Sequence, residues 1–581
     1  MRRAATVAVA AVVTLSSVAG LGACAQIPTS GPVRVGNADI DTQVDIAMLP
    51  QGPSLGADPQ VIVAGFLGAV VAATTSPKEF QTAREFLTDD VAAKWDPEAS
   101  VRVVREAPVP APVERGVELK DTDTVEVVVR ATTIATVDSA GAYTEVGDPR
   151  ELGYRFTLVK SGGEWRISAL DDGVLVPANL FANQYRATRL FFPAESDPTS
   201  LVPDLRWFPR RTWRNVAVEE LLAGPPEWLQ GAARSLVPEG TQLSSPSVRD
   251  TDGEEAVAVR LSEQISTAPA EERAVIAAQL SATLSEGAGR VVPVDLYSGQ
   301  NRLSVDTADV NLPATLTEPM ALKDDALYLV ADGALEPWGQ DAGEPLDLSG
   351  MNPTALAISP ATEPIVLRDG DDQIWDLTAE DGPVSLFEGP DLAAPSVDKF
   401  AATWTSGGSG ELRVAPEVGS EMEEVTLKPE WLSGRKVISV SVAPEGSRVA
   451  IVSEAPTGTQ VHVAGVVRNH DDVPVALAAP LSVAAPIDDI VEARWAGITT
   501  LALLTEDNDG VTGVWTAGVG GLAGAGGAAR QLPGLTDVEQ LAAGVADPGM
   551  LVITEGGHLE HEETGVWQPF DEDVELVAFP G

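Results

Sequence analysis

The chain has 581 residues, and 44% of them are hydrophobic. This is too apolar for a mostly disordered protein, and the length suits about three or four domains with cores of their own. Its 86 acidic and 38 basic residues give a formal net charge of −48, which argues against binding to nucleic acid or to anionic lipid headgroups, because both require positive charge on the protein. The single cysteine excludes disulfide bonds within the chain, so each domain depends on its own core.

The N-terminus has the order of features typical of a bacterial lipoprotein signal peptide. A short basic start at Arg2 and Arg3 precedes a small, apolar and uncharged stretch at residues 4–18. The tetrapeptide Leu21-Gly22-Ala23-Cys24 follows, and it has the residue types of a lipobox. This order predicts a secretory signal peptide that ends at a lipidated cysteine.

Cys24 is the predicted lipid attachment site. Cleavage after Ala23 would remove residues 1–23 and leave Cys24 as the first mature residue, carrying S-diacylglycerol and N-palmitoyl groups. The alternative is a membrane-spanning anchor, but residues 4–18 fall short of the about 18–20 apolar residues that span a bilayer. We therefore expect a protein held by its lipid at the extracytoplasmic face of the cell membrane.

A flexible tether and a first domain are predicted next. Residues 24–55 are rich in Pro, Gly and Asp and lack periodicity, which indicates the tether. At residues 56–178 we expect an α+β domain of NTF2-like type, in which a curved sheet wraps a helix. Apolar residues recur at helical or strand spacing in two helices, at 61–70 and 80–93, and in strands at 101–104, 116–119, 125–137, 154–159 and 164–169.

A second domain, of α/β type, is predicted at residues 184–306. Its elements are a strand at 189–193, a helix that contains Val216 to Leu222 and ends at Gly224, a strand at 255–261, an amphipathic helix at 270–284 and a strand at 291–297.

The last part of the chain, residues 312–581, predicts an all-β propeller. Helical periodicity disappears, and short strands alternate with Gly, Pro, Asp and Ser. Similar pairs of strands recur about every 40 to 50 residues, which is the period of propeller blades. The copies start near Leu327, Ala355, Trp404, Val440, Ala493 and Gly544, so we expect about six blades.

Four short motifs that could carry chemistry are each incomplete. A glycine-rich run at 518–523 lacks the helix of a dinucleotide site. An acidic run at 505–510 lacks the bidentate acid that closes a calcium loop six residues after its glycine, because Thr516 stands there. His558 and His561 have no further ligand, and the Ser-Gly run at 406–410 lacks the spacing of a nucleophile elbow. We expect no catalytic, metal or cofactor site and no enzymatic activity.

Tryptophans leave an alternative open. Trp375, Trp404, Trp495 and Trp515 could stack on sugar rings, which would fit a cell-envelope glycan-binding protein or hydrolase that holds its substrate in the propeller. Each of them also lies in or beside a strand-like run, which favours packing between blades.

The sequence resembles the LpqB lipoproteins of actinobacteria over essentially the whole mature chain. The segments that carry the resemblance are 24–32, 66–69, 84–88 and 94–97, followed by 216–225, 237–241 and 294–297. The last three segments are similar to a GerMN domain, which is named for sporulation and germination proteins.

This resemblance implies a non-enzymatic accessory lipoprotein. It would bind the extracytoplasmic domain of a two-component sensor histidine kinase of the MtrB type and thereby affect cell-wall homeostasis and division. Composition and spacing add only that such a role is compatible with three modules on a membrane tether, which raises the local concentration of a partner in the same bilayer.

Overall fold

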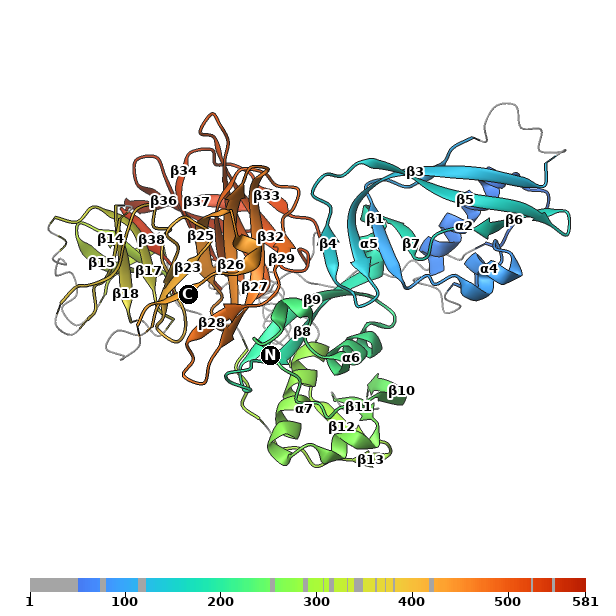
Figure 1. Ribbon diagram of the computed structural model, residues 1–581, viewed down its shortest axis with the longest axis horizontal. Coiled ribbons are helices and arrows are strands. Elements are labelled where there is room, and N and C mark those ends of the chain that lie inside the picture. The colour runs from blue at the N-terminus through green and yellow to red at the C-terminus, as the bar shows by residue number, and fades with distance from the viewer. Residues whose placement is uncertain are drawn as a thin grey trace, which may run out of the picture. The chain divides into compact units, whose positions relative to one another are not determined.

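The computed structural model describes residues 51–581 except for 74–79, 113–121, 251–255, 286–290, 307, 313–317, 332, 339–347, 349, 361–362, 371, 380–381, 417–422, 524–525 and 546–548. The described residues belong to one compact unit, Gln43–Gly581. Ala23, Cys24, the tether up to residue 50 and the strand expected at 116–119 lie outside the described residues. In Figure 1 the chain passes from a blue and cyan α+β assembly through a green α/β assembly to yellow and red sheets.

The first assembly is one sheet packed on a helix. Its strands are β1 (Ser100–Val104), β2 (Val109–Pro110), β3 (Thr124–Asp138), β4 (Tyr143–Glu145), β5 (Glu151–Ser161), β6 (Glu164–Ala169) and β7 (Val174–Pro177). They follow the order β6-β5-β3-β1-β7, with β2 and β4 paired along β3. The helix α2 (Pro59–Ala73) buries Phe66, whose ring meets those of Trp95 and Phe156 edge-on at 5.3 and 6.0 Å between centroids.

The prediction of a single helix at residues 80–93 is wrong. The structure has two short helices there, α3 (Gln81–Arg84) and α4 (Asp89–Lys94). Between them the Phe86 carbonyl accepts a hydrogen bond from Ile167 N–H, and Thr88 N–H donates to the Ile167 carbonyl. The backbone of residues 86–88 therefore pairs with β6 instead of continuing the helix.

A two-stranded ribbon follows the short helix α5 (Ala178–Gln184). Its strands β8 (Tyr185–Pro193) and β9 (Leu201–Pro209) pair antiparallel over their whole length. All residues of β9 except Pro209 are buried, including the ion pair of Asp204 and Arg206, whose side chains are 2.6 Å apart. The hydrophobic pattern of the sequence predicts only residues 189–193 of β8 and does not predict β9.

The α/β assembly contains α6 (Trp213–Ala223) and α7 (Ala270–Leu284), the short 3-10 helices η1 (Glu227–Leu229) and η2 (Glu263–Thr267), and one sheet. The strands of the sheet are β10 (Leu243–Asp250), β11 (Val257–Leu261), β12 (Val294–Ser298) and β13 (Asn301–Arg302), in sequence order. β11 and β12 run parallel, and α7 lies in the chain between them. Gly224 ends α6 with a φ of 94°, a left-handed conformation that suits glycine.

The described part of the propeller forms six sheets, which we number as blades. Blade 1 has β14 (Met320–Lys323), β15 (Ala326–Ala331) and β16 (Ala334–Pro337); blade 2 has β17 (Pro353–Ile358), β18 (Ile365–Asp369), β19 (Gln373–Asp376) and β20 (Val384–Glu388). Blade 3 has β21 (Ser396–Val397), β22 (Thr403–Thr405), β23 (Leu412–Ala415) and β24 (Val425–Leu427). Blade 4 has β25 (Lys436–Val442), β26 (Arg448–Ala455), β27 (Gly458–Arg468), β28 (Pro474–Leu477) and β29 (Leu481–Val483), preceded by the 3-10 helix η3 (Glu430–Leu432).

The remaining two blades lead back to the first. Blade 5 has β30 (Ile490–Gly497), β31 (Thr500–Glu506), β32 (Thr512–Gly518) and β33 (Arg530–Leu532); blade 6 has β34 (Val538–Ala543), β35 (Met550–Thr554), β36 (His558–Glu563) and β37 (Val566–Asp573). The last strand, β38 (Leu576–Ala578), pairs antiparallel with β14 and completes blade 1. The C-terminal strand thus closes the ring with the first strand of the propeller.

The core of the ring lies between neighbouring blades. Leu322 of blade 1 packs with Ile358 of blade 2, and Trp404 of blade 3 packs with Val440 of blade 4. This arrangement explains the repeated sequence, because one small sheet cannot bury both of its faces alone. The predicted fold class, a multidomain protein with an N-terminal α+β part and a C-terminal propeller of about six blades, is confirmed.

Candidate functional site

The innermost strands of the six blades surround a channel with two different ends. At the ends of these strands, the last residues of the chain line the channel, and Gly581 N–H donates to the Ile358 carbonyl at 3.0 Å. The cavity that remains there is about 30 Å³, which is room for about one or two water molecules. The chain's own C-terminus therefore narrows this end.

The other end opens into a cavity of about 610 Å³, which we call the wide mouth. The beginnings of β17, β25, β30 and β34 line it together with loops of blades 5 and 6, and its lining comes entirely from the propeller. Its charge is uneven. Blades 5 and 6 contribute five carboxylates, whereas blades 2 to 4 contribute mostly neutral side chains. The carboxylates belong to Glu492, Glu506, Asp537, Glu539 and Glu555.

The two arginines of the wide mouth are held by neighbouring groups. Arg494 Nε donates to Glu492 Oε1 at 2.8 Å, and Arg494 Nη2 lies 2.7 Å from the same oxygen. Arg368 Nε donates to Thr354 Oγ1 at 2.9 Å, and its Nη1 donates to the Leu392 carbonyl at 3.0 Å. Among the described residues, the other four carboxylates form no ion pair, so the lining carries an excess of negative charge.

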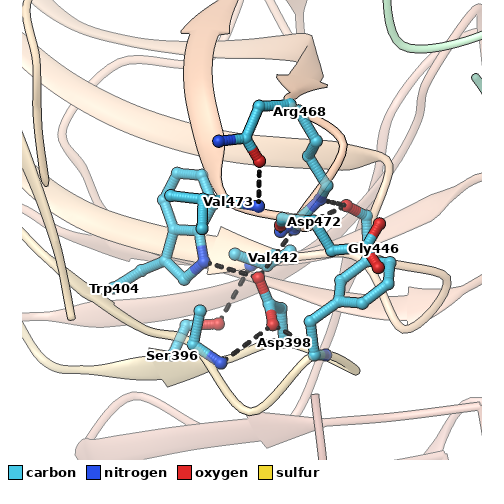
Figure 2. Close-up of polar contacts among 11 residues, drawn as sticks. Ser396, Asp398, Trp404, Val442, Gly446, Arg468, Asp472 and Val473 are labelled. Atoms are coloured by element: carbon cyan, nitrogen blue, oxygen red, sulfur yellow. Dashed lines mark hydrogen bonds and ion pairs between the residues drawn. The ribbon is translucent and has the colours of Figure 1, made fainter. Parts of the chain in front are cut away.

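A buried ion pair joins blades 3 and 4 (Figure 2). Asp398 Oδ2 accepts hydrogen bonds from Arg468 Nη2 at 2.7 Å and from Trp404 Nε1 at 2.9 Å. Asp398 Oδ1 accepts the N–H groups of Phe400 and Ala402, which fixes the turn between β21 and β22.

The same arginine reaches two further turns. Its Nη2 donates to the Gly446 carbonyl at 2.9 Å and its Nη1 to the Asp472 carbonyl at 2.6 Å, and its guanidinium lies 4.3 Å from the centre of the Phe400 ring. Figure 2 shows Arg468 above the Asp398 carboxylate, with Trp404 to the side. Arg468 thus organises turns of two blades on one face of the ring.

The β8–β9 ribbon contacts this face. Lys399, beside Asp398, donates from Nζ to Ser200 Oγ at 3.0 Å. Trp207 of the ribbon donates from Nε1 to the Gly520 carbonyl at 2.9 Å, in the turn that follows β32. Glu145 of β4 accepts the N–H of Ala529 in blade 5, and burial raises the pKa of this carboxyl.

Glycines make close contact possible at this interface. A Cβ at Gly520 would lie 2.4 Å from the Leu205 carbonyl oxygen, and one at Gly527 would lie 2.3 Å from the Tyr143 ring. The glycine-rich run at 518–523, which lacks the helix of a dinucleotide site, is therefore packed against the ribbon and against β4. The glycine-rich composition of the run indicates a close backbone contact, but the residues that it contacts could not be identified from the sequence.

The wide mouth lies on the opposite face of the ring. The ribbon contacts involve turns that follow the first strand of blade 3 and the third strand of blade 5. In a blade of four antiparallel strands, the ends of the first and third strands lie on the same face. Because the beginnings of the innermost strands line the wide mouth, the ribbon leaves it uncovered.

The other residues considered for chemistry have structural partners. Ser406 is fully buried and donates to the Glu411 carbonyl, and Asp507 accepts two backbone N–H groups within its own hairpin turn. His558 is exposed and lies 2.7 Å from Asp573, whereas His561 packs on Phe570. The described residues contain no group of three or more His, Cys, Asp or Glu side chains that could hold a metal ion.

Two of the four tryptophans considered for sugar binding are buried. Trp404 has no exposed surface, and Trp495 is 3% exposed, with its Nε1 donating to the Ser441 carbonyl and the Arg448 guanidinium 4.5 Å from its ring centre. Trp375 and Trp515 are half-buried in strands. In the first assembly, the cavity beside Phe66 and Tyr154 has a volume of about 30 Å³, which is room for about one or two water molecules.

Together these features define a multidomain protein in which an α/β domain and a six-bladed propeller follow an α+β domain. Three family models match the chain. Residues 52–182 match the N-terminal domain of lipoprotein LpqB, residues 189–321 match the Germane domain (sporulation and spore germination), and residues 339–578 match the LpqB β-propeller domain. The chain belongs to the LpqB lipoprotein family.

Two relatives named Lipoprotein LpqB support this assignment over most of the chain. Lipoprotein LpqB of Bifidobacterium longum is 27% identical over 81% of this chain and 81% of its own length. Lipoprotein LpqB of Cutibacterium acnes is 25% identical over 96% and 97% of the two chains. The crystal structure of TolB from Acinetobacter baumannii is similar over 45% of this chain and 65% of its own, with 13% identity and a TM-score of 0.32.

The two relatives from Bifidobacterium longum and Cutibacterium acnes are named as lipoproteins and not as enzymes. Within the described part of the chain, every helix is too short or too polar to cross a membrane. Attachment through Cys24 after cleavage at Ala23 stays a prediction of the sequence, because both residues lie outside the described part.

Proposed function

We propose that this protein is a lipid-anchored accessory regulator of a two-component sensor histidine kinase of the MtrB type, and that it acts by binding the extracytoplasmic domain of the kinase. The proposal is supported by one observation above all. The propeller presents a charged, open mouth on the face that the rest of the described chain leaves uncovered. Such a surface suits contact with another protein more than conversion of a substrate.

The tether would let the domains reach a kinase in the same membrane. Cys24, with N-palmitoyl and S-diacylglycerol groups, would hold the protein at the extracytoplasmic face of the cell membrane, and the segment up to residue 55 would let the domains search the nearby surface. A partner in the same bilayer is then present at a high effective concentration, so that weak contact is sufficient. Through the kinase, the protein would influence cell-wall homeostasis and division.

Replacing the lipidated cysteine tests the proposal. Cys24→Ser should release the protein from the membrane and lower phosphorylation of the paired response regulator, whereas the folded domains should be unchanged. Phosphorylation is measured in cells that express the wild type and the variant at equal level. Normal signalling by the released variant would contradict the tether, and failure of the purified chain to bind the kinase domain would contradict the regulator.

A further inference from the structure

We propose that the wide mouth of the propeller binds a basic segment of a protein partner, and that blades 5 and 6 make the charged contact. This site deepens the regulator proposal and rests on it for the partner's identity, the extracytoplasmic domain of the kinase. The geometry that carries it is a cavity of about 610 Å³ with four carboxylates left without an ion pair among the described residues.

The negative charge of the cavity favours a positively charged ligand. Arg494 is paired with Glu492, and Arg368 donates to the neutral Thr354 hydroxyl and Leu392 carbonyl. The lining therefore holds five carboxylates against two guanidinium groups and keeps a net negative charge. The carboxylates without an ion pair among the described residues belong to Glu506, Asp537, Glu539 and Glu555. A concave surface with like charges and low-dielectric walls focuses its field and attracts ligands of opposite sign.

The size and shape of the cavity favour a polypeptide over a metal ion. Its volume lies within the about 300–1,000 Å³ of pockets that hold organic ligands. The described carboxylates do not gather into a group that could coordinate a metal. Blades 2 to 4 contribute Ala355, Ala394 and Ile438 beside Thr354, Ser439 and Arg368. The three apolar residues can contact the aliphatic stems of Lys or Arg while their charged heads reach blades 5 and 6.

Matched charge variants test the site in the full-length lipidated chain, purified in detergent. The mouth variant combines Glu506→Gln, Glu539→Gln and Glu555→Gln, three exposed side chains of the cavity rim. The control variant combines Glu423→Gln, Glu563→Gln and Asp571→Asn, which are exposed, lie outside the cavity and change the net charge equally. A third variant, Thr536→Trp, fills the mouth without changing its charge.

The affinity of each variant is measured for two binding partners. These are the purified kinase sensor domain and a labelled decapeptide of alternating Lys and Gly. The mouth variant should bind both roughly tenfold more weakly, because three exposed charge contacts are lost, and its binding should depend less on salt. Thr536→Trp should also weaken both, and the control should bind as the wild type does. Unchanged melting temperatures show that the variants are folded.

The outcomes separate the site from the regulator proposal. If the wild type binds the sensor domain and the mouth and control variants bind it equally well, the mouth is not the contact surface, and the regulator proposal stands. If the wild type does not bind the sensor domain, the regulator proposal is wrong, and the decapeptide decides the site alone. Selective loss of decapeptide binding in the mouth variant supports the site, whereas equal affinity of mouth and control variants overturns it.

Discussion

The Asp398 carboxylate and the Arg468 guanidinium lie 2.7 Å apart inside the propeller, with 0% and 3% of their side chains exposed. Removing one partner leaves the other charge buried and unpaired. We expect Asp398→Ala to lower the free energy of unfolding by about 3–5 kcal/mol. Because Phe400 and Ala402 donate to Asp398, their amide hydrogens should also exchange faster, which hydrogen-exchange measurements detect locally.

A surface pair provides the control for this prediction. Arg130 and Glu151 form an ion pair with 68% and 59% of their side chains exposed, so Glu151→Ala should cost at most about 1 kcal/mol. Equal losses of stability in the two variants would contradict a special role for the buried pair.

The contact between the ribbon and blade 5 depends on Gly520. Gly520→Ala should loosen it, because the new Cβ would lie 2.4 Å from the Leu205 carbonyl oxygen. Gly510 offers a matched comparison, since its φ of 79° is close to the 87° of Gly520 but its Cβ position is open. Gly510→Ala should cost only the backbone strain, about 1–2 kcal/mol.

The indole N–H of Trp207 reports on this contact, because it donates to the Gly520 carbonyl. Gly520→Ala should expose the ring to a fluorescence quencher, whereas Gly510→Ala should leave the quenching unchanged. If both variants behave alike, backbone strain and not the collision determines the effect.

His462 makes the stability of blade 4 depend on pH. Burial, with Arg435 nearby, lowers its pKa from 6.5 to about 4. As pH falls from 6.5 to about 4, the unfolded chain takes up a proton that the folded protein does not, so stability is lost over this range. The loss is at most about 3 kcal/mol, and less because the ring is partly exposed.

Unfolding as a function of pH tests this prediction. His462→Gln should flatten the decline between pH 6.5 and 4, and His470→Gln, at a side chain that is 88% exposed, should not. The ring of Trp431 lies 5.3 Å from that of His462, so its fluorescence gives a local signal. An unchanged slope in His462→Gln would rule out this histidine as the cause.

The sequence predicted the elements that repeat or that have local end signals. The strand pairs of the blades recur with one period because each blade must bury both of its faces against its neighbours. Gly224 marks the end of α6, where the backbone takes a left-handed conformation. Strand β9 escaped prediction because Pro203, Asp204 and Arg206 break its alternation, although the strand is buried on both sides. The pairing of Asp204 with Arg206, together with the hydrogen bond from Arg206 Nη1 to the Ala140 carbonyl, makes that burial tolerable.

The wide mouth could not be predicted for a different reason. Its lining comes from residues as far apart as Thr354 and Glu555, which ring closure brings together. No spacing in the sequence marks such a set. In the same way, the glycine-rich run at 518–523 was visible, but its contact with Trp207 depends on the fold.

The ring itself depends on β38, whose Val577 pairs with Ala321 of β14 and donates its N–H to Gln540 Oε1 at 3.1 Å. Val577→Pro removes this donor, which links β38 to the Gln540 side chain of blade 6, and should loosen the junction of blades 1 and 6 at a cost of about 1–3 kcal/mol. The control is Val384→Pro, at the exposed first residue of the edge strand β20, where proline is tolerated. Calorimetry should show a lower or broader propeller transition only for Val577→Pro.

The wide mouth is assembled by the closed ring. The same variant should therefore also lose binding of the lysine-glycine decapeptide, and retained binding would show that the mouth does not depend on ring closure.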